Sequence, residues 1–438
     1  MAHNPAIMKA VEQFGYRVTV GDVAANAGLE LNETQQGLLT LASDAGGHLQ
    51  VAESGDIAYE FPKNFRSILS NKYWQLRWQQ WWQKVSKTLF YLLRISFGIV
   101  LILSIILMVI AIAAIVIYMN SSRDGDDGDN RSGGGFNFAY MPRFWFGPDI
   151  FWWFDPGYNS YYQRQHHRKG SSEKAKMSFL EAIFSFLFGD GDPNWNLDER
   201  RWNNIGTTIR NNSGAVIAEQ IAPYMDNLES NSSTYEYEEY MLPVLARFNG
   251  YPEVSPQGDI IYHFPELQVS ATKQKKQSVP AYLKELPRRF SEATSGQKMG
   301  AITLGAANLI LALVLGSMLR GSVELQAIGL IAFVNSIYWF LLGYAIAFLS
   351  IPVIRYFLLQ RKNQKIEKRS LKRQKLAVTL NEATPELQNK LAFAQKFAAQ
   401  KSLTQEDIAY STQKDLLEQN LEQADKIDAE WQRRLNEG

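Results

Sequence analysis

Three long apolar blocks dominate the pattern of hydrophobic and polar positions. The first runs from Leu89 to Tyr118 and carries a single charge, Arg94. Two more blocks, Gly300–Leu319 and Ala327–Leu349, are separated only by the short segment 320–326. A helix needs roughly 20 apolar residues to cross a bilayer, and each block provides at least that number. The pattern therefore predicts three transmembrane helices, of which the last two form a tight hairpin.

One polar and apolar pattern occurs twice outside these blocks. Gly55–Pro62 reads GDIAYEFP and Gly258–Pro265 reads GDIIYHFP. Ahead of each copy, apolar residues at helical spacing give way to alternation with period two, which predicts helices followed by a β-hairpin. A basic linker and then membrane-length sequence follow each copy. We therefore expect two copies of one soluble module, each preceding a membrane segment.

The predicted order of elements in the first module resembles the winged-helix fold, a variant of the helix-turn-helix. The string VTVGDVAANAGLELNETQQGLLTLASDAGGHLQVAESGDIAYEF, from Val18 to Phe61, carries this resemblance. The second copy departs from it through an Asn- and Ser-rich insertion and through Pro223 and Pro243. In most members of the fold the third helix lies in the major groove of DNA.

The charge of both modules disfavours nucleic acid as a partner. The third helix of the first module begins Glu30-Leu31-Asn32-Glu33 without a basic residue, and its hairpin is acidic. The equivalent segment of the second module begins YEYEEY and adds only Arg247. Carboxylates facing phosphates repel them instead of releasing counterions. We expect modules that bind protein or each other; a purely structural pair is the alternative.

Aromatic and basic residues border the apolar blocks. Indole rings favour the headgroup layer, and four tryptophans recur at helical spacing before the first block: Trp74, Trp78, Trp81 and Trp82. Seven basic residues after the third block are predicted to contact anionic lipid: Arg361, Lys362, Lys365, Lys368, Arg369, Lys372 and Arg373. The bias of positive charge predicts a cytoplasmic C-terminus. It leaves open the side of the second module, and whether 136–154 or 177–188 enters the bilayer.

Small and amide residues within the hairpin predict close helix packing. Gly305 and Gly316 let helix backbones approach each other, and Asn308 is expected to pair with Asn335 through a hydrogen bond of about 1 kcal/mol. The C-terminal segment is predicted to be helical, with Thr404 and Asp407 forming a capping box ahead of a helix from Gln405 to Asn436.

The residues that could carry chemistry are few. The chain has no cysteine, which excludes disulfides, thiolate zinc sites and cysteine-held iron–sulfur clusters. Asp190 to Asp198 begins like a calcium loop, but Trp195 replaces the glycine and Arg201 the glutamate that such a loop requires. Cations surround His166-His167 and oppose a metal there. We predict no catalytic, cofactor-binding or metal-binding residue and no enzymatic activity.

The whole order, including the segment FGDGDPNWNLDERRW from Phe188 to Trp202, is similar to an uncharacterised integral-membrane family of cyanobacteria and plastids. The resemblance implies a cyanobacterial thylakoid or plasma membrane. Some plastid members carry a loose label of iron–sulfur cluster biosynthesis. The absence of cysteine gives that label no chemical support as a cluster scaffold.

These observations predict a mainly α membrane protein with two winged-helix-like α+β modules, about three transmembrane helices and a helical tail. The predicted segments are a first module (1–66), a Trp-rich segment with the first span (67–120), a flexible and aromatic linker (121–176), a short helix with the second module (177–270), a basic linker (271–299), the transmembrane hairpin (300–359) and a charged tail (360–438). The expected function is a membrane-anchored scaffold or assembly factor that binds membrane or membrane-associated proteins, with homo-oligomerisation left open. The alternatives are a membrane-tethered nucleic-acid-binding regulator and, behind it, a transporter subunit.

Overall fold

The computed structural model describes residues 3–72, 74–121, 177–226, 238–273, 276–320, 329–382 and 384–415, with scattered positions from 417 to 435. The chain forms two compact units. The module unit comprises Met1–Trp82, Pro193–Pro287 and Gln364–Gly438, and the membrane unit comprises Gln83–Asp192 and Arg288–Asn363. The predicted linker 121–176 and the His166-His167 pair lie outside the described residues, apart from Ser121.

Module 1 begins with helix α1 (Pro5–Gln13), strand β1 (Arg17–Thr19) and helices α2 (Val20–Ala27) and α3 (Leu31–Ala45). The strands β2 (His48–Ala52) and β3 (Ile57–Glu60) follow, and helix α4 (Phe65–Lys72) closes the segment. Thr19 and Asp22 form a capping box that begins α2. Left-handed glycines, Gly28 and Gly46, end α2 and α3.

Module 2 repeats this order with a longer first helix and with shorter second and third helices. It consists of α8 (Leu197–Asn211), β4 (Ala215–Val216), α9 (Ala218–Ile221), the 3₁₀ turns η4 (Ala222–Tyr224) and η5 (Glu239–Met241), α11 (Leu242–Phe248), β5 (Tyr251–Val254) and β6 (Ile260–His263). Pro223 lies inside η4 and Pro243 in the first turn of α11. Because proline lacks an N–H and is tolerated best in a first turn, these helices are short.

The two modules share one backbone plan. Their sheets have the strand orders β1-β3-β2 and β4-β6-β5. The hairpin turns match in detail: Ala52 N donates to Asp56 O, and Ser255 N donates to Asp259 O, both at 2.8 Å. Gly55 and Gly258 occupy the same turn position with φ of 86° and 93°, a conformation that requires glycine. The repeat in the sequence thus corresponds to a repeat in the backbone.

Modules 1 and 2 pack against each other through α2 and α8. One buried apolar core contains Ala24 and Ala25 of module 1 together with Ile205 and Ile209 of module 2. The helices approach closely at Gly206, where a Cβ atom would lie 2.7 Å from the Cα of Ala25. The modules are therefore two halves of one folded body.

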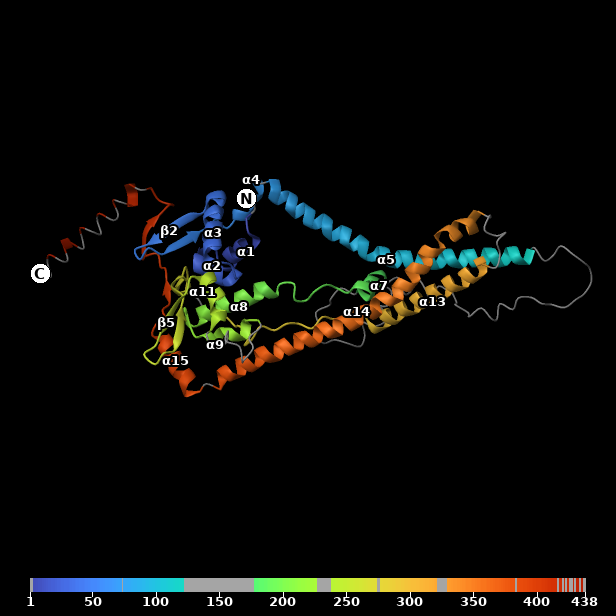
Figure 1. Cartoon of the computed structure of the whole chain (residues 1–438). Coiled ribbons are helices and arrows are strands. Elements are labelled where there is room, and N and C mark those ends of the chain that lie inside the picture. The colour runs from blue at the N-terminus through green and yellow to red at the C-terminus, as the bar shows by residue number, and fades with distance from the viewer. Residues whose placement is uncertain are drawn as a thin grey trace, which may run out of the picture. The chain divides into compact units, whose positions relative to one another are not determined.

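The C-terminal segment folds back onto both modules, and the predicted helix from Gln405 is wrong at its start. After α15 (Pro385–Gln395), strand β8 (Lys401–Ser402) pairs with β7 (Val269–Ser270), which follows the short helix α12 (Pro265–Gln268). Strand β9 (Ile408–Ser411) pairs with the edge strand β2, as Figure 1 shows. Thr404 and Asp407 do bond as predicted, but the exposed edge of β2 offers hydrogen bonds that draw the next residues into the sheet.

The membrane unit contains α5 from Gln83 onward, α7 (Phe179–Phe188), α13 (Ser295–Arg320) and the first part of α14; α5 spans Trp74–Ser121 and α14 spans Gly329–Asn381. Among the residues that the structure describes, three helices are long and apolar enough to cross a membrane: α5, α13 and α14. They lie side by side in Figure 1 and share a buried core. The ten-residue helix α7 is shorter than a span and packs on the other three helices.

The close approach at Gly206 predicts that Gly206→Ala will destabilise the protein. A methyl group in an α-helix is normally favourable by about 1 kcal/mol, but here it overlaps the backbone of α2. We expect a net loss of about 1–3 kcal/mol in the free energy of unfolding. Thermal unfolding of the purified full chain in detergent measures the change. Gly343→Ala, in α14 with no atom near the added Cβ, is the matched control and should keep its stability or gain up to about 1 kcal/mol. Equal stability of the two variants would contradict the packing described for α2 and α8.

Candidate functional site

A polar seam runs along the contact between the modules, and Asp22 is its centre. The Asp22 side chain is 1% exposed and forms an ion pair with Arg210 of module 2. Its carboxylate also accepts hydrogen bonds from the backbone N–H groups of Thr19 at 2.9 Å and Ala271 at 3.0 Å. A buried charge is tolerated only when it is paired and hydrogen-bonded in this way. The seam therefore fixes the two modules in one arrangement.

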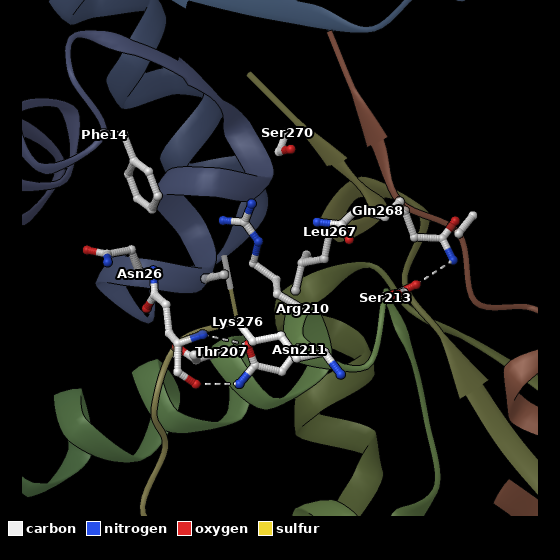
Figure 2. Close-up of a pocket in the computed structure, with 14 residues that line it drawn as sticks. Phe14, Asn26, Thr207, Arg210, Asn211, Ser213, Leu267, Gln268, Ser270 and Lys276 are labelled. Atoms are coloured by element: carbon white, nitrogen blue, oxygen red, sulfur yellow. Dashed lines mark hydrogen bonds between the residues drawn. The ribbon is translucent and has the colours of Figure 1, made fainter. Parts of the chain in front are cut away.

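The cavity in this seam is too small for a ligand larger than a few atoms. Figure 2 shows Arg210, Asn211 and Thr207 of α8 near Phe14 and Asn26 of module 1, around a cavity of about 40 Å³. Its polar groups bond to each other: Gln268 Nε2 donates to Ser213 O at 3.3 Å, and Asn211 Nδ2 donates to Gln277 O at 2.7 Å. The site is therefore a contact between the two modules, and it has no room for a bound molecule of ordinary size.

The third helices of the modules present no row of free cations. Helix α3 contains no lysine or arginine, and its exposed first turn carries Glu33. Helix α11 contains only Arg247, whose guanidinium donates to Gly28 O at 2.5 Å and lies 4.2 Å from the centre of the Trp202 ring. The basic side chain of the second helix is thus engaged within the protein.

Buried ion pairs attach the C-terminal part of α14 to the linker after module 2. Arg373 is 3% exposed and donates to Glu285 Oε1 at 2.9 Å and to Leu283 O at 2.9 Å; it also pairs with Asp226. Arg369 pairs with the same Glu285 at 2.6 Å. Burial alone would raise the pKa of Glu285, but the two arginines outweigh it and hold that pKa below its usual value.

These contacts correct part of the predicted lipid-binding surface. Arg373 is buried in ion pairs and is not available to a lipid headgroup, and Arg369 is committed to Glu285 although it is half-exposed. The other predicted residues are exposed on α14: Arg361, Lys362, Lys365, Lys368 and Lys372. The sequence shows only a basic run, whereas the fold places carboxylates beside two of its members.

A second set of ion pairs attaches α15 to module 2. Lys390 Nζ donates to Glu219 at 2.9 Å and to Glu238 at 2.7 Å, and Tyr262 Oη donates to the other oxygen of Glu238 at 2.7 Å. Burial would lower the pKa of Lys390, but the two carboxylates outweigh it and raise that pKa. Burial, followed by Glu238, raises the pKa of Tyr262. Sequence analysis missed these residues because only tertiary contacts bring them together.

The predicted tryptophan cluster lies on the first turns of α5. Trp78, Trp81 and Trp82 are exposed, and the Trp78 and Trp82 rings stack with centres 6.3 Å apart. Trp74 is the first residue of the same helix, and its side chain lies outside the described residues. Exposed stacked indoles are the kind of surface that favours a headgroup layer, so the interfacial role remains a prediction.

The acidic loop after α7 forms ion pairs with arginines. Asp190 pairs with Arg94, the one charge of the first apolar block, and accepts a hydrogen bond from Ser185 Oγ at 2.6 Å. Asp192 pairs with Arg288. This arrangement explains how α5 tolerates Arg94. Among the residues that the structure describes, no group of three or more His, Asp or Glu side chains is placed to hold a metal.

The hairpin residues pack, but the predicted pair of asparagines is replaced by another bond. A Cβ at Gly305 would lie 2.6 Å from Phe348, and at Gly316 it would overlap Tyr338. Asn308 is fully buried and accepts a hydrogen bond from Ser104 Oγ of α5 at 3.0 Å. Its Nδ2 has no hydrogen-bond partner among the described residues, and Asn335 is half-buried on α14. The Asn308 amide group therefore connects α13 to α5, which packs against α13 and α14, and not α13 to Asn335 of α14.

Comparisons with known proteins identify one informative similarity. The chain is 37% identical over 447 residues to the uncharacterised chloroplastic protein At5g03900 of Arabidopsis thaliana, and the match covers 98% of this chain and 82% of the plant protein. No family model matches the chain. No solved structure matches it either.

The buried pair of Arg373 and Glu285 predicts that substitutions of two neighbouring cations will affect stability to very different extents. Arg373→Gln removes one of the two arginines that pair with the buried Glu285, and the one that is itself buried, and should lower the free energy of unfolding by about 3 kcal/mol. Lys372→Gln, at an exposed position, is the matched control and should change it by less than about 0.5 kcal/mol. Thermal unfolding of the full chain in detergent distinguishes them.

The stability that Glu285 contributes should also depend on pH, and thermal unfolding at different pH values measures this dependence. Because the folded-state pKa of Glu285 lies below its unfolded value, its contribution is complete above about pH 4.3 and is lost as the pH falls through the folded-state value. Glu285→Gln should remove this acid-dependent part. If Arg373→Gln and Lys372→Gln have equal stability, or if the acid dependence survives Glu285→Gln, the proposed contribution of this ion pair is wrong.

Proposed function

Because the chain belongs to the same family as the chloroplast protein At5g03900, and because it has three helices that could span a membrane, we propose that it is a membrane-anchored scaffold or assembly factor. In this role the module unit binds protein partners beside the bilayer. The membrane is a thylakoid or plasma membrane in a cyanobacterium, or its counterpart in a plastid.

The charge of the module unit is the observation that carries this proposal. Helix α3 has no cation, and the single cation of α11 is bonded to module 1. Glu30 and Glu33, at the start of α3, are exposed. Such a surface repels phosphate backbones and complements a basic protein surface, so it favours a protein partner over nucleic acid.

Exposed apolar side chains on the module unit support a protein partner as well. Trp195 is 79% exposed, and Leu242 and Val254 are 63% and 62% exposed. Aromatic and aliphatic side chains of this kind are enriched in the buried centres of protein interfaces. Single exposed apolar residues are common, however, and the acidic charge is the stronger argument.

The arrangement of helices and strands supports winged-helix-like modules in this proposal. Each module contributes three antiparallel strands, with the hairpin strand β3 or β6 between the other two, and β9 adds a fourth strand to the sheet of module 1. In such modules the third helix and the hairpin form the usual binding surface. Fold alone does not specify a function, so the charge argument decides the kind of partner.

Contacts within the membrane unit support a common side for both modules and the C-terminal segment. Helix α7 packs on Leu101 of α5, Ala301 near the start of α13 and Phe348 of α14, and Met177 O accepts a bond from Gln297. The far half of α5, around Ile115, packs on Leu319 and Ile331 instead. Ser121 and Met177 are therefore at opposite ends of the helices. We propose that both modules and the C-terminal segment lie on one side, the cytoplasmic or stromal one.

This topology predicts a labelling pattern that the absence of native cysteine makes simple to measure. Single variants Thr40→Cys, Gln257→Cys and Gln374→Cys, all at exposed positions, should react with a membrane-impermeant maleimide from the same side of sealed native membranes. Met119→Cys, at the other end of α5, should react only from the opposite side. Labelling of Thr40→Cys and Gln257→Cys from different sides would refute the common compartment.

The scaffold proposal predicts that partner binding depends on the acidic surface. After cross-linking in native membranes, the full chain should capture a defined set of proteins, and Glu30→Lys with Glu33→Lys should reduce their capture about tenfold, equivalent to about 1.4 kcal/mol. Quantitative mass spectrometry gives the readout. Glu367→Lys, an exposed reversal on α14, is the control and should leave capture unchanged. Salt-sensitive binding of DNA or RNA by the full chain, with no Glu-dependent protein partner, would support the regulator instead.

A further inference from the structure

The third helix and the hairpin of module 2 present apolar side chains to solvent. Two residues, Asn249 and Gly250, join helix α11 to strand β5. Five exposed apolar residues of these elements define the α11–β5 surface: Leu242, Pro243, Ala246, Pro252 and Val254. In module 1 the exposed positions of α3 are polar except for Leu39: Asn32, Glu33, Gln35, Gln36, Thr40 and Ser43. The two copies of the module therefore share a backbone plan but differ in surface chemistry.

Helix α11 and the exposed apolar side chains of β5 lie on the same side of the sheet. Pro252 is paired with Tyr262, and Val254 is paired with Ile260. Residues directly opposite each other in an antiparallel pair point to the same face. Tyr262 belongs to the buried core that also contains Val244 of α11, and Ile260 packs against this core. A single element of a partner protein can therefore contact α11 and β5 together.

The outer edge of β5 is unsuited to pairing with another strand. In the part of the chain that the structure describes, β5 is the last strand of its sheet, whereas the equivalent strand β2 also pairs with β9. There the Leu49 N–H donates to Thr412 Oγ1 at 2.9 Å. Pro252 occupies the position of Leu49, since each is opposite the equivalent tyrosine, and proline has no N–H to donate. A partner has to bind through side chains instead, and one face of an α-helix can supply them.

The charge around the α11–β5 surface favours a basic partner. Residues 238–260 contain one cation, Arg247, which is bonded to Gly28 O of module 1. The other charged side chains of this segment are carboxylates: Glu238, Glu239, Glu253 and Asp259. Lys390 pairs with Glu238 and neutralises it. The remaining negative charge complements lysine and arginine. It disfavours anionic lipid headgroups, and it disfavours a second copy of this chain, because a symmetric contact would bring like charges together.

We propose that the α11–β5 surface binds a basic amphipathic helix of a partner protein. The apolar face of that helix contacts Leu242 and Val254, and its lysine or arginine side chains lie near Glu239 and Glu253. This inference rests on the proposed function and adds the chemistry of the partner to it. Buried apolar contacts at the centre of an interface provide most of its affinity, and charges at its rim reject partners of the wrong sign.

Site-specific photo-cross-linking of the full chain in native membranes tests this proposal. Benzoylphenylalanine in place of Ala246 should cross-link to another protein, and mass spectrometry should show a net basic peptide with apolar residues three and four positions apart. Leu242→Gln with Val254→Gln should lower the yield at least about tenfold, equivalent to about 1.4 kcal/mol. Leu371→Gln with Val378→Gln, at exposed apolar positions of α14, is the matched control and should leave the yield unchanged. Thermal unfolding should be the same for both double variants.

Reversing the charge at the rim is an independent test that keeps the apolar residues. Glu239→Lys with Glu253→Lys should also lower the cross-linking yield, because the new cations oppose those of the partner helix. The proposal is overturned by cross-links only to lipid, to a second copy of this chain or to an acidic peptide. It is equally overturned by the absence of any cross-link, or by equal yields in the Leu242→Gln, Val254→Gln variant and its control.

The same experiments separate this surface from the role proposed for α3. If the cross-link at position 246 behaves as expected, but Glu30→Lys with Glu33→Lys does not reduce partner capture, the role of α3 fails while the α11–β5 surface stands. If that charge reversal reduces capture, but position 246 cross-links only to lipid, the scaffold function stands and the α11–β5 surface fails.

Discussion

The contact between α2 and α8 is the constraint on which the module unit depends. Gly206 lets the helix backbones approach, and the apolar residues around Ala25 and Ile205 are buried only because both modules contribute to one core. Asp22 then places a charge inside this contact, where it needs Arg210 and two backbone N–H groups at once. Removing one partner of such a charge is costly, which favours a single relative arrangement of the modules.

The same principle attaches the C-terminal part of the chain. Arg373 on α14 and Lys390 on α15 each sit between two carboxylates that lie far away in the sequence. Strand β9 completes the attachment by pairing with β2 of module 1. Arg369 and Arg373, which were predicted to contact lipid, form ion pairs within the protein instead. Neither of them pairs with Glu30 or Glu33 at the start of α3. This division of charge is why a protein partner is the proposal we favour.

In the membrane unit, packing replaces charge as the organising interaction. Gly305 and Gly316 accommodate the rings of Phe348 and Tyr338, and the buried amide of Asn308 accepts a bond from Ser104. Arg94 is neutralised by Asp190 from the loop after α7. Polar groups at these depths are tolerated because each contacts the protein, as membrane proteins require.

The sequence alone predicted the three long apolar helices and the repeat of Gly55–Pro62 in Gly258–Pro265, because these depend on periodicity and local backbone chemistry. It also predicted the close approach of helices at Gly305 and Gly316. It did not predict that Arg373 is buried, that Asn308 bonds to Ser104, or that the residues after Asp407 form a strand. Those outcomes depend on which distant carboxylate, hydroxyl or sheet edge lies nearby, and only the tertiary structure decides that.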